Sequence, residues 1–555
     1  MNLSVSFEGR NYEVERYTSV EELMKLAKYE VSPDYNDNPP VGAFVNGEAR
    51  PLSYRFCSSS SVVPVRVFDP MGRRIYRHSL SFLLFYAAKL VFPDRRLVIG
   101  HSLGSSFYFR FDDGSRDIDA DVCVIEKKMR ELVSMKLSIE FCSVPFKEAI
   151  NFFSINGNRT TVMLLACINT PDVNVYKTGD YCDIAYEPIV SNTSVLSLWK
   201  LAPYGSDGMI LQYPVSSAIT EIKPFKDNPL LFSVFEENKQ WGKILGVRCV
   251  GEMNEVVFQN RAKQFVRHAE ALHRRKLAQV ADSVFERDAH AVFIAGPSSS
   301  GKTTFAKRLC EQLALLGKHT IRISLDDYYL PRKVLPKNAK GEPDYECLEA
   351  LRVEQFRKNM KDIFDGKQVC LPKWSFSKQE QSFPDPPVSF TENTVFVIEG
   401  IHGLNPQITS CVNPKYVFKV YISALTQLNL DDHNRVSTTD NRLIRRIVRD
   451  LRERGASVVD TLSMWDDVTA AESKNIFIHQ NNADVMVNSA LDYELGVLAP
   501  YASPVLKSVS AETGRVYATA RRLLAFLENV YEVPAELVPA DSALREFIGQ
   551  SDYSD

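Results

Sequence analysis

The chain has 555 residues, too many for one hydrophobic core, which predicts about three or four domains of roughly 100–200 residues each. Its hydrophobic content of 45%, charged content of 24% and net charge of −3 are those of a globular protein with no global attraction to nucleic acid or anionic membranes. The ten cysteines include no CxxC pair, which argues against a disulfide framework or a structural zinc site.

The first residues, MNLSVSFEGRNYEV, lack the basic and apolar regions of a signal peptide. The longest apolar run, SFLLFYAAKLVF, is interrupted by Lys89 and is too short to span a bilayer. We therefore expect a cytoplasmic protein with no membrane partner.

Residues 1–65 alternate apolar and polar side chains, with turn signals at Gly9 and at Asn46-Gly47. Between these hairpins, SVEELMKLAKY has helical spacing, with Ser19 as the N-cap and Glu22 as its capping-box partner. The pattern predicts a small β-grasp module.

Residues 66–235 mix helix and strand and are expected to form an α+β domain. HSLSFLLFYAAKLVF and IEKKMRELVSMKL predict helices, whereas TVMLLACI and GMILQYPV are interpreted as strands. A helical connector follows over residues 236–287, including one long, polar, charge-rich helix over residues 254–285. Such a helix is usually a solvated face or an interdomain strut and not a nucleic-acid arm.

From residue 288 the order changes to strand, glycine-rich loop, helix and strand: AVFIAG, KTTFAKRLCEQLALLG and HTIRISL. This order predicts a parallel sheet over residues 288–500, to which NTVFVIEG and YVFKVYI add buried strands. Residues 501–555 form a C-terminal helical extension. The predicted fold class is a multidomain α/β and α+β protein with a P-loop NTPase at its C-terminal end.

The loop AGPSSSGKTTF matches the P-loop pattern, in which backbone N–H groups cradle phosphate oxygens and the following helix adds its positive end. Lys302 would reach the β- and γ-phosphates of ATP, and Thr303 would ligate Mg²⁺. The predicted nucleotide contacts are Gly296, Pro297, Ser298, Ser299, Ser300, Gly301, Lys302, Thr303 and Thr304.

Acidic residues follow two of the apolar strands: Asp326 and Asp327 in IRISLDDYYLP, and Glu399 in VFVIEGIHGLN. Strand ends of an open α/β sheet converge on the nucleotide crevice, where a carboxylate can hold Mg²⁺ or accept a hydroxyl proton. The helix NRLIRRIVRDLRERG would close over the triphosphate as a basic lid. Its alternative is an exposed helix whose arginines pair with Asp450 and Glu453.

These motifs together resemble the uridine kinase and phosphoribulokinase family from about Ala291 to Leu495. NRLIRRIVRDLRERG is similar to that family's lid, SLDDYY to the segment that bears its catalytic base, and ADVMVNSAL to its late adenine-side strand. The resemblance implies that Asp326 is the base, that Glu399 and Asp326 lie on the Mg²⁺ side, and that Arg446 and Arg449 contact phosphate.

The sequence departs from this family in the segments that bind the phosphate acceptor. PDYECLEAL offers Asp344, Glu346 and Glu349 as partners for the acceptor, and WSF replaces the usual YDF loop. The candidates for stacking a base are Tyr328, Trp374 and Phe376. The family's base-reading positions hold Ala456 and Met464. An insertion, TQLNLDDHNRVSTTD, either contacts the acceptor through Asp431, Asp432, His433 and Arg435 or forms a polar loop.

Residues from about 1 to 200 resemble the N-terminal region of threonyl-tRNA synthetases, a TGS domain followed by an editing domain. GRRIYRHSLSFLLFYAAKLVFPDRRLVIGHSLGSSFYFRFDD and GDYCDIAYEP carry the similarity. Of the four polar positions of that editing site, His78 and Cys182 remain, but Phe82 and Tyr186 stand at the other two. Because a phenyl ring neither relays protons nor binds metal, we interpret this module as an editing fold that no longer hydrolyses tRNA esters.

The function expected from these features is Mg²⁺- and ATP-dependent phosphorylation of the 5′-hydroxyl of a nucleoside. A sugar or sugar-phosphate kinase stays open, with Lys373, Lys378 and Arg332 available for a second phosphate. A tRNA-associated P-loop NTPase is disfavoured by the near-neutral charge and the complete lid. The expected partners are ATP and a small-molecule acceptor, and a homo-oligomer is compatible with the sequence.

Overall fold

A computed structural model gives the fold of this chain. It describes residues 2–29, 32, 34–104, 106–214, 221–338, 341–375 and 378–553.

The N-terminal module is a mixed sheet with the strand order β2-β1-β5-β3-β4, on which one helix packs. Its elements are β1 (Asn2–Phe7), β2 (Arg10–Glu15), α1 (Val20–Leu26), β3 (Pro40–Val45), β4 (Glu48–Arg50) and β5 (Ser60–Arg66). The predicted capping box is present, because the Ser19 hydroxyl accepts from the Glu22 N–H at 3.1 Å and the Glu22 carboxylate accepts from the Ser19 N–H at 2.6 Å.

The second module has a sheet of order β11-β12-β7-β6, which packs on α2 and α3, and a smaller sheet of order β10-β9-β8. Its elements are α2 (Pro70–Val91), β6 (Leu97–Leu103), β7 (Ser106–Phe111), α3 (Ile118–Ser134), β8 (Glu140–Pro145), α4 (Phe146–Ile155), α5 (Arg159–Ile168), β9 (Asp172–Thr178), β10 (Tyr181–Ile184), β11 (Lys200–Tyr204) and β12 (Gly208–Gln212).

The strand predicted for TVMLLACI is wrong, because these residues belong to the helix α5. A short apolar run fits a buried helix as well as a strand. Here the packing partner favours the helix, because α5 lies so close to the helix over residues 250–258 that a Cβ on Gly251 would stand 3.0 Å from the Leu164 nitrogen.

The connector consists of α6 (Pro229–Leu245), α7 (Val250–Phe258) and α8 (Ala262–Glu286). The single helix predicted over residues 254–285 is therefore wrong, because the chain turns between α7 and α8, where Asn260 has φ 57°. Nor is α8 merely a solvated strut. Leu277, Val280 and Val284 on one of its faces are buried beneath the parallel sheet.

The C-terminal half is built on a parallel sheet of order β14-β17-β13-β18-β19. Its strands are β13 (Ala291–Ala295), β14 (His319–Ser324), β17 (Thr394–Glu399), β18 (Val417–Ser423) and β19 (Val485–Asn488), beside a hairpin of β15 (Lys373–Ser375) and β16 (Glu380–Ser382). The helices are α9 (Lys302–Leu315), α10 (Val353–Phe364), α11 (Pro406–Thr409), α12 (Thr438–Glu453), α13 (Val458–Asn475), α14 (Glu494–Lys507), α15 (Arg515–Leu527) and α16 (Arg545–Ile548). The α/β and α+β multidomain prediction is confirmed.

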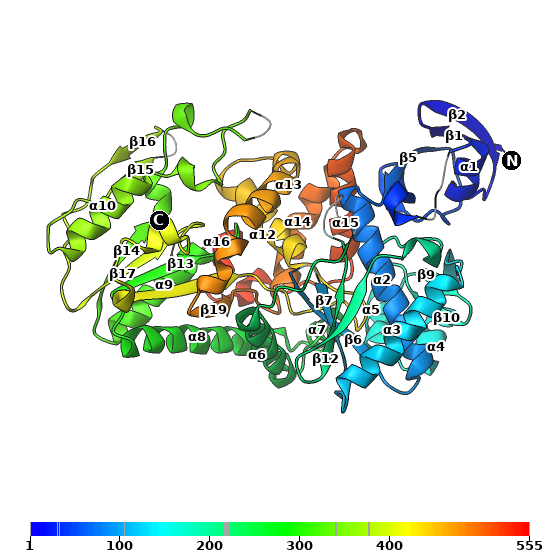
Figure 1. Cartoon of the computed structure of the whole chain (residues 1–555), viewed down its shortest axis with the longest axis horizontal. Coiled ribbons are helices and arrows are strands. Elements are labelled where there is room, and N and C mark those ends of the chain that lie inside the picture. The colour runs from blue at the N-terminus through cyan, green and yellow to red at the C-terminus, as the bar shows by residue number, and fades with distance from the viewer. Residues whose placement is uncertain are drawn as a thin grey trace.

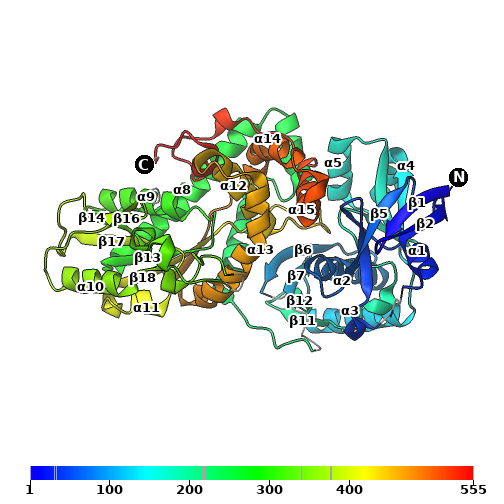
Figure 2. The same ribbon diagram turned by 90° about the horizontal axis from the view of Figure 1, so that it is seen from above.

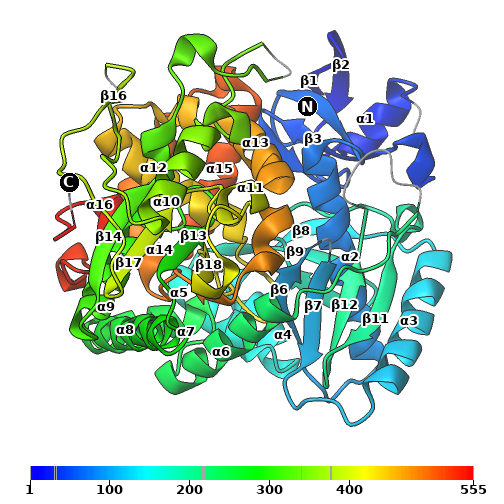
Figure 3. The same ribbon diagram turned by 60° about the vertical axis from the view of Figure 1, so that its left-hand side comes forward.

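The parallel sheet and the two N-terminal modules lie at opposite ends of the molecule, with α12 to α15 between them (Figure 1). The view from above shows the same order (Figure 2). On the underside, α6 packs both on β19 of the parallel sheet and on β6 of the second module (Figure 3). Arg521 on α15 donates to the Glu48 carboxylate on β4 at 2.8 Å. The two halves therefore share extensive contacts.

Within the described ranges, no helix is both long and apolar enough to cross a membrane.

Candidate active site

The P-loop joins β13 to α9 and is shaped for close backbone approach. A Cβ on Gly296 would stand 2.0 Å from the Ile422 carbonyl oxygen, so only glycine allows this packing of the loop on β18. Ser299 and Gly301 have left-handed φ values of 58° and 79°, which curl the backbone. The hydroxyls of Ser299 and Ser300 are buried and have no hydrogen-bond partner among the described residues. Unpaired buried donors in a curled loop suit phosphate oxygens.

Lys302 starts α9 and lies over the loop, where its ammonium donates to the Pro297 carbonyl at 3.1 Å. Burial lowers the pKa of Lys302, while the nearby carboxylates of Glu399 and Asp326 raise it. The loop, a buried cation and two carboxylates therefore meet at the carboxyl edge of the sheet, the position at which open α/β sheets bind ligands.

The strand ends place hydroxyls around the carboxylate of Glu399. The Thr303 hydroxyl lies 3.3 Å and the Ser324 hydroxyl 3.2 Å from the same Glu399 oxygen. Burial and then repulsion by Asp326 raise the pKa of Glu399 to about 7. No group of three or more His, Cys, Asp or Glu able to hold a metal occurs in the described part of the chain. These hard oxygens fit Mg²⁺ that is shared with phosphate oxygens and water.

Asp326 and Asp327 have different surroundings although they are neighbours. Asp327 is held by the hairpin: its carboxylate accepts from the Trp374 N–H at 3.0 Å and lies 3.3 Å from the Lys373 ammonium. Asp326 is an exposed residue instead. The surrounding protein partly desolvates the Asp326 carboxylate, and this raises its pKa. The Lys302 ammonium lowers this pKa, and the Asp327 carboxylate raises it. Asp326 is thus the carboxylate free to meet a bound molecule.

The predicted lid helix α12 is buried on all sides from Asp440 to Asp450, so the exposed-helix alternative is wrong. Arg442 donates to the Ser298 carbonyl at 3.0 Å and pairs with Glu472, and Arg445 donates to the Ser299 carbonyl at 3.3 Å and pairs with Glu494. These two arginines hold the P-loop in place.

Arg446 and Arg449 lie at the open side of the lid. Arg446 donates to the Ser298 hydroxyl at 3.0 Å, and both arginines pair with Asp450, at 3.0 and 3.1 Å. Both side chains are about one-tenth exposed, so an anion entering the loop would meet guanidinium groups already oriented by one carboxylate.

The predicted acceptor residues are only partly brought together. Tyr328 is wrong as a stacking platform, because its ring is buried in the core against Phe356 and its hydroxyl accepts from Asn359. Trp374 lies on the hairpin beside Asp327, and Phe376 lies outside the described residues.

The three acidic candidates for contact with the acceptor also have different surroundings. Asp344 caps its own turn by accepting from the Glu346 N–H at 2.9 Å, and Glu349 lines an outer groove with Arg352 and Gln407. Glu346, the third acceptor candidate, is the one whose pKa responds to charged residues of the P-loop and its lid. Burial and then Glu472 raise its pKa to about 7, and Lys302 lowers it.

Two further contacts to the loop and its helix could not be read from motifs. Glu472 on α13 accepts from the Ser298 N–H at 2.8 Å, so a carboxylate already binds one loop amide. Thr304 donates to Glu546 of α16 at 2.7 Å, which directs its hydroxyl away from the loop. Both partners are far away in sequence, in segments without a recognisable pattern.

His78, one of the two polar residues that the resemblance places at editing positions, belongs to a charge network that reaches the lid helix. His78 lies 3.1 Å from the Glu187 carboxylate, and burial lowers the pKa of His78 to about 4. Glu187 also pairs with Arg74, which lies 3.0 Å from Asp440 in the first turn of α12. A partnered, neutral His78 fits the interpretation of this module as non-hydrolytic.

The insertion at residues 426–440 enters the second module, which decides between the two alternatives left open for it. His433 stacks on Phe85 at 3.9 Å and lies 2.7 Å from the Asp183 carboxylate, next to Cys182. Asp431 accepts from the Thr161 hydroxyl at 3.0 Å. The insertion therefore packs against Phe85, Thr161 and Asp183 of the second module and not against the P-loop.

Comparison with known proteins separates the chain into the same C-terminal and N-terminal parts. Residues 291–495 match the Phosphoribulokinase / Uridine kinase family. Threonine–tRNA ligase of Francisella tularensis subsp. novicida is 32% identical over 161 residues, 29% of this chain and 25% of the ligase, and that of subsp. tularensis is 31% identical over the same length. The chain thus spans about a quarter of the length of the curated relatives it matches.

Among solved structures, a possible uridine kinase from Bacillus stearothermophilus is similar at 18% identity and a TM-score of 0.24, covering 36% of this chain and 89% of that one. By the family match, residues 291–495 form a P-loop domain of the phosphoribulokinase/uridine kinase family, which follows an N-terminal region that matches threonine–tRNA ligases.

Proposed function

We propose that this protein transfers the γ-phosphoryl group of ATP, with Mg²⁺, to the hydroxyl of a small molecule, most favourably the 5′-hydroxyl of a nucleoside. The observation that carries the proposal is the meeting of Lys302, Asp326 and Glu399 at one edge of the sheet beneath a buried basic lid. Phosphoryl transfer needs mainly positioning and charge stabilisation, and this set supplies both.

Each side chain has a distinct task in this proposal. The loop amides and Lys302 bind the phosphates, and Thr303 with Glu399 would hold Mg²⁺, which neutralises phosphate charge when bound. Asp326 accepts the proton of the attacking hydroxyl. Its raised pKa brings it closer to neutral pH, which suits a general base.

The lid arginines supply the remaining positive charge. Arg446 and Arg449 each form an ion pair with Asp450. A triphosphate offers more negative charge than one carboxylate, so these guanidinium groups would turn to the transferring phosphoryl group. Fixed donors aimed at developing charge are the largest single contribution to catalysis in many enzymes.

The nucleoside assignment rests on the family resemblance and on the aromatic side chain of Trp374 beside Asp327. Directed base-reading partners are few, since Ala456 and Met464 stand at the usual positions and Tyr328 is buried. A site without such partners discriminates weakly between bases. We therefore expect a nucleoside kinase with broad base preference.

A sugar-phosphate acceptor is the second candidate. The Lys373 ammonium lies 3.3 Å from the Asp327 carboxylate, on the acceptor side of Asp326, where it could meet a second phosphate. Lys378 and Arg332 are exposed, and the Arg332 N–H donates to the side chain of Gln379, next to Lys378, at 2.9 Å. A panel of nucleosides, sugars, polyols and sugar phosphates at fixed Mg-ATP, with products identified by mass, separates the candidates. If every nucleoside fails while a sugar phosphate reacts, the nucleoside assignment is wrong and the kinase chemistry stands.

A further inference from the structure

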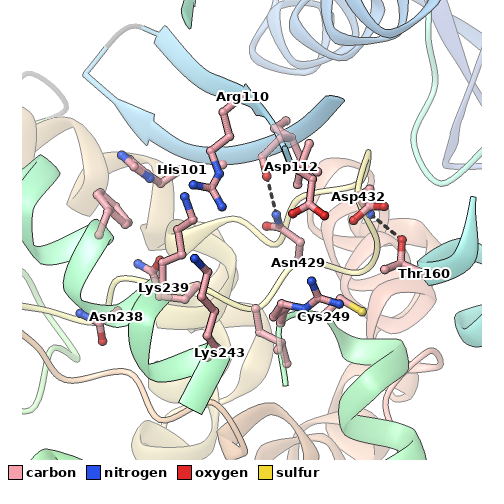
Figure 4. Close-up of a pocket in the computed structure, with 18 of the residues that line it drawn as sticks. His101, Arg110, Asp112, Thr160, Asn238, Lys239, Lys243, Cys249, Asn429 and Asp432 are labelled. Atoms are coloured by element: carbon pink, nitrogen blue, oxygen red, sulfur yellow. Dashed lines mark hydrogen bonds between the residues drawn. The ribbon is translucent and has the colours of Figure 1, made fainter. Parts of the chain in front are cut away.

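A cavity of about 140 Å³ lies between the two halves of the molecule, apart from the P-loop. Its walls are β6 and β7 of the second module, α6 of the connector, and residues 426–432 of the insertion (Figure 4). Neither the kinase site nor the editing-like cleft accounts for it.

Three basic side chains from two walls of this interdomain pocket point into it. Arg110 reaches in from β7, while Lys239 and Lys243, one turn apart on α6, point toward it (Figure 4). The carboxylates that pair with these cations lie at long distances: Arg110 is 3.9 Å from Asp207, and Lys239 is 3.5 Å from Glu236. Lys243 has no ion pair among the described residues. The lining also holds four aspartates. Arg96 pairs with Asp112 and Asp432, and Asp431 accepts from the Thr161 hydroxyl. Burial and then Glu494 raise the pKa of Asp492 to about 7, which favours its neutral form.

Two buried polar atoms in the lining of the pocket lack hydrogen-bond partners among the described residues. The Nε2 atom of His101 and the hydroxyl of Thr426 have no hydrogen-bond partner in the described part of the protein, although these residues are only 7% and 6% exposed. The His101 ring is fixed in place because it stacks on Phe235 at 3.4 Å. Burying such groups unpaired is unfavourable unless something in the pocket satisfies them.

We propose that this pocket binds a small phosphorylated metabolite that also carries hydroxyl groups. Three convergent cations suit a phosphate monoester, which offers two charges and three acceptor oxygens. His101 and Thr426 suit hydroxyls on the rest of the molecule. A concave site with a few convergent polar groups is the usual form of a small-molecule site.

The location gives the occupant contact with both halves. Asn429, in the wall, donates to the Ile99 carbonyl of β6 at 2.8 Å, and the same segment continues into α12, the lid helix. A molecule in this pocket therefore touches the chain that leads to the phosphate-contacting arginines without entering their site.

The test is calorimetric titration of the full chain, without ATP, using ribose 5-phosphate, inorganic phosphate and neutral ribose as probes. We expect ribose 5-phosphate to bind, phosphate to bind more weakly and ribose not to bind. Lys243→Ala should weaken binding at least about tenfold, and Lys243→Arg should retain it, since the cation is kept. Lys263→Ala, at an exposed position on α8, is the matched control and should bind like wild type.

Lys302→Ala separates this site from the P-loop. Binding that persists in Lys302→Ala and is lost in Lys243→Ala supports the proposal. Binding lost in Lys302→Ala but kept in Lys243→Ala belongs to the P-loop and overturns it, as does the absence of binding by both anions at millimolar concentration. Because no phosphoryl transfer is measured, these outcomes are independent of whether the proposed kinase activity is found.

Discussion

Replacing Asp326 by asparagine removes the proposed base while preserving its size. General-base catalysis contributes about 10²–10⁴-fold, so kcat should fall by that factor, roughly 3–5 kcal/mol of barrier. Asp327→Asn is the matched control. Its amide oxygen can still accept from the Trp374 N–H, and the Lys373 side chain is 39% exposed, so losing this ion pair should cost at most about 1 kcal/mol.

The assay is ADP release with the best acceptor of the panel, combined with thermal unfolding of each variant. Asp326→Asn should melt no lower than wild type, because it removes a negative charge that, after burial, contributes to raising the pKa of Glu399 to about 7. An Asp326→Asn variant that keeps more than a tenth of wild-type kcat, or an Asp327→Asn variant equally impaired, would refute this reasoning.

Three further predictions address the loop and the second module. Lys302→Ala should fold normally yet lose at least about a thousandfold in phosphoryl transfer, and near wild-type turnover would contradict the P-loop assignment. Burial alone would lower the pKa of His433, but the Asp183 carboxylate raises this pKa to about 9. The stabilisation that the charged imidazole gives to the fold is therefore complete below pH 6.5 and is lost as the pH rises through 9. The melting temperature should therefore fall over that range, and less so in His433→Phe, which keeps the stack on Phe85; an identical fall in both proteins would disprove the coupling. Mischarged threonyl-type tRNA should not be deacylated, and hydrolysis that His78→Ala abolishes would overturn that expectation.

Local signals were sufficient where neighbouring residues determine the structure. The capping box of Ser19 and Glu22 and the P-loop from Gly296 to Thr303 involve partners a few residues apart, and the first is confirmed in detail. The parallel sheet followed from the alternation of apolar strands and helices.

The remaining features depend on partners distant in sequence. Residues 161–168 are helical because α7 packs on them, and Tyr328 is buried because α10 covers it. The insertion contacts Asp183, some 250 positions earlier, and the Ser298 N–H binds Glu472. No spacing within a short window encodes such contacts, so sequence patterns could name these residues but not their partners.

Asp440, at the start of α12, is held from two sides: Arg74 of the second module and Arg522 of α15 both pair with it. A chain that looks modular in sequence is therefore unsuited to dissection. Cutting after residue 287 would remove Arg74 and strip Leu164 and Val250 from the apolar cluster that contains Leu428 and Leu430. The two halves of the chain thus form one cooperatively packed unit. The C-terminal half expressed alone should be prone to aggregation, with Asp440 of its lid helix paired to Arg522 only.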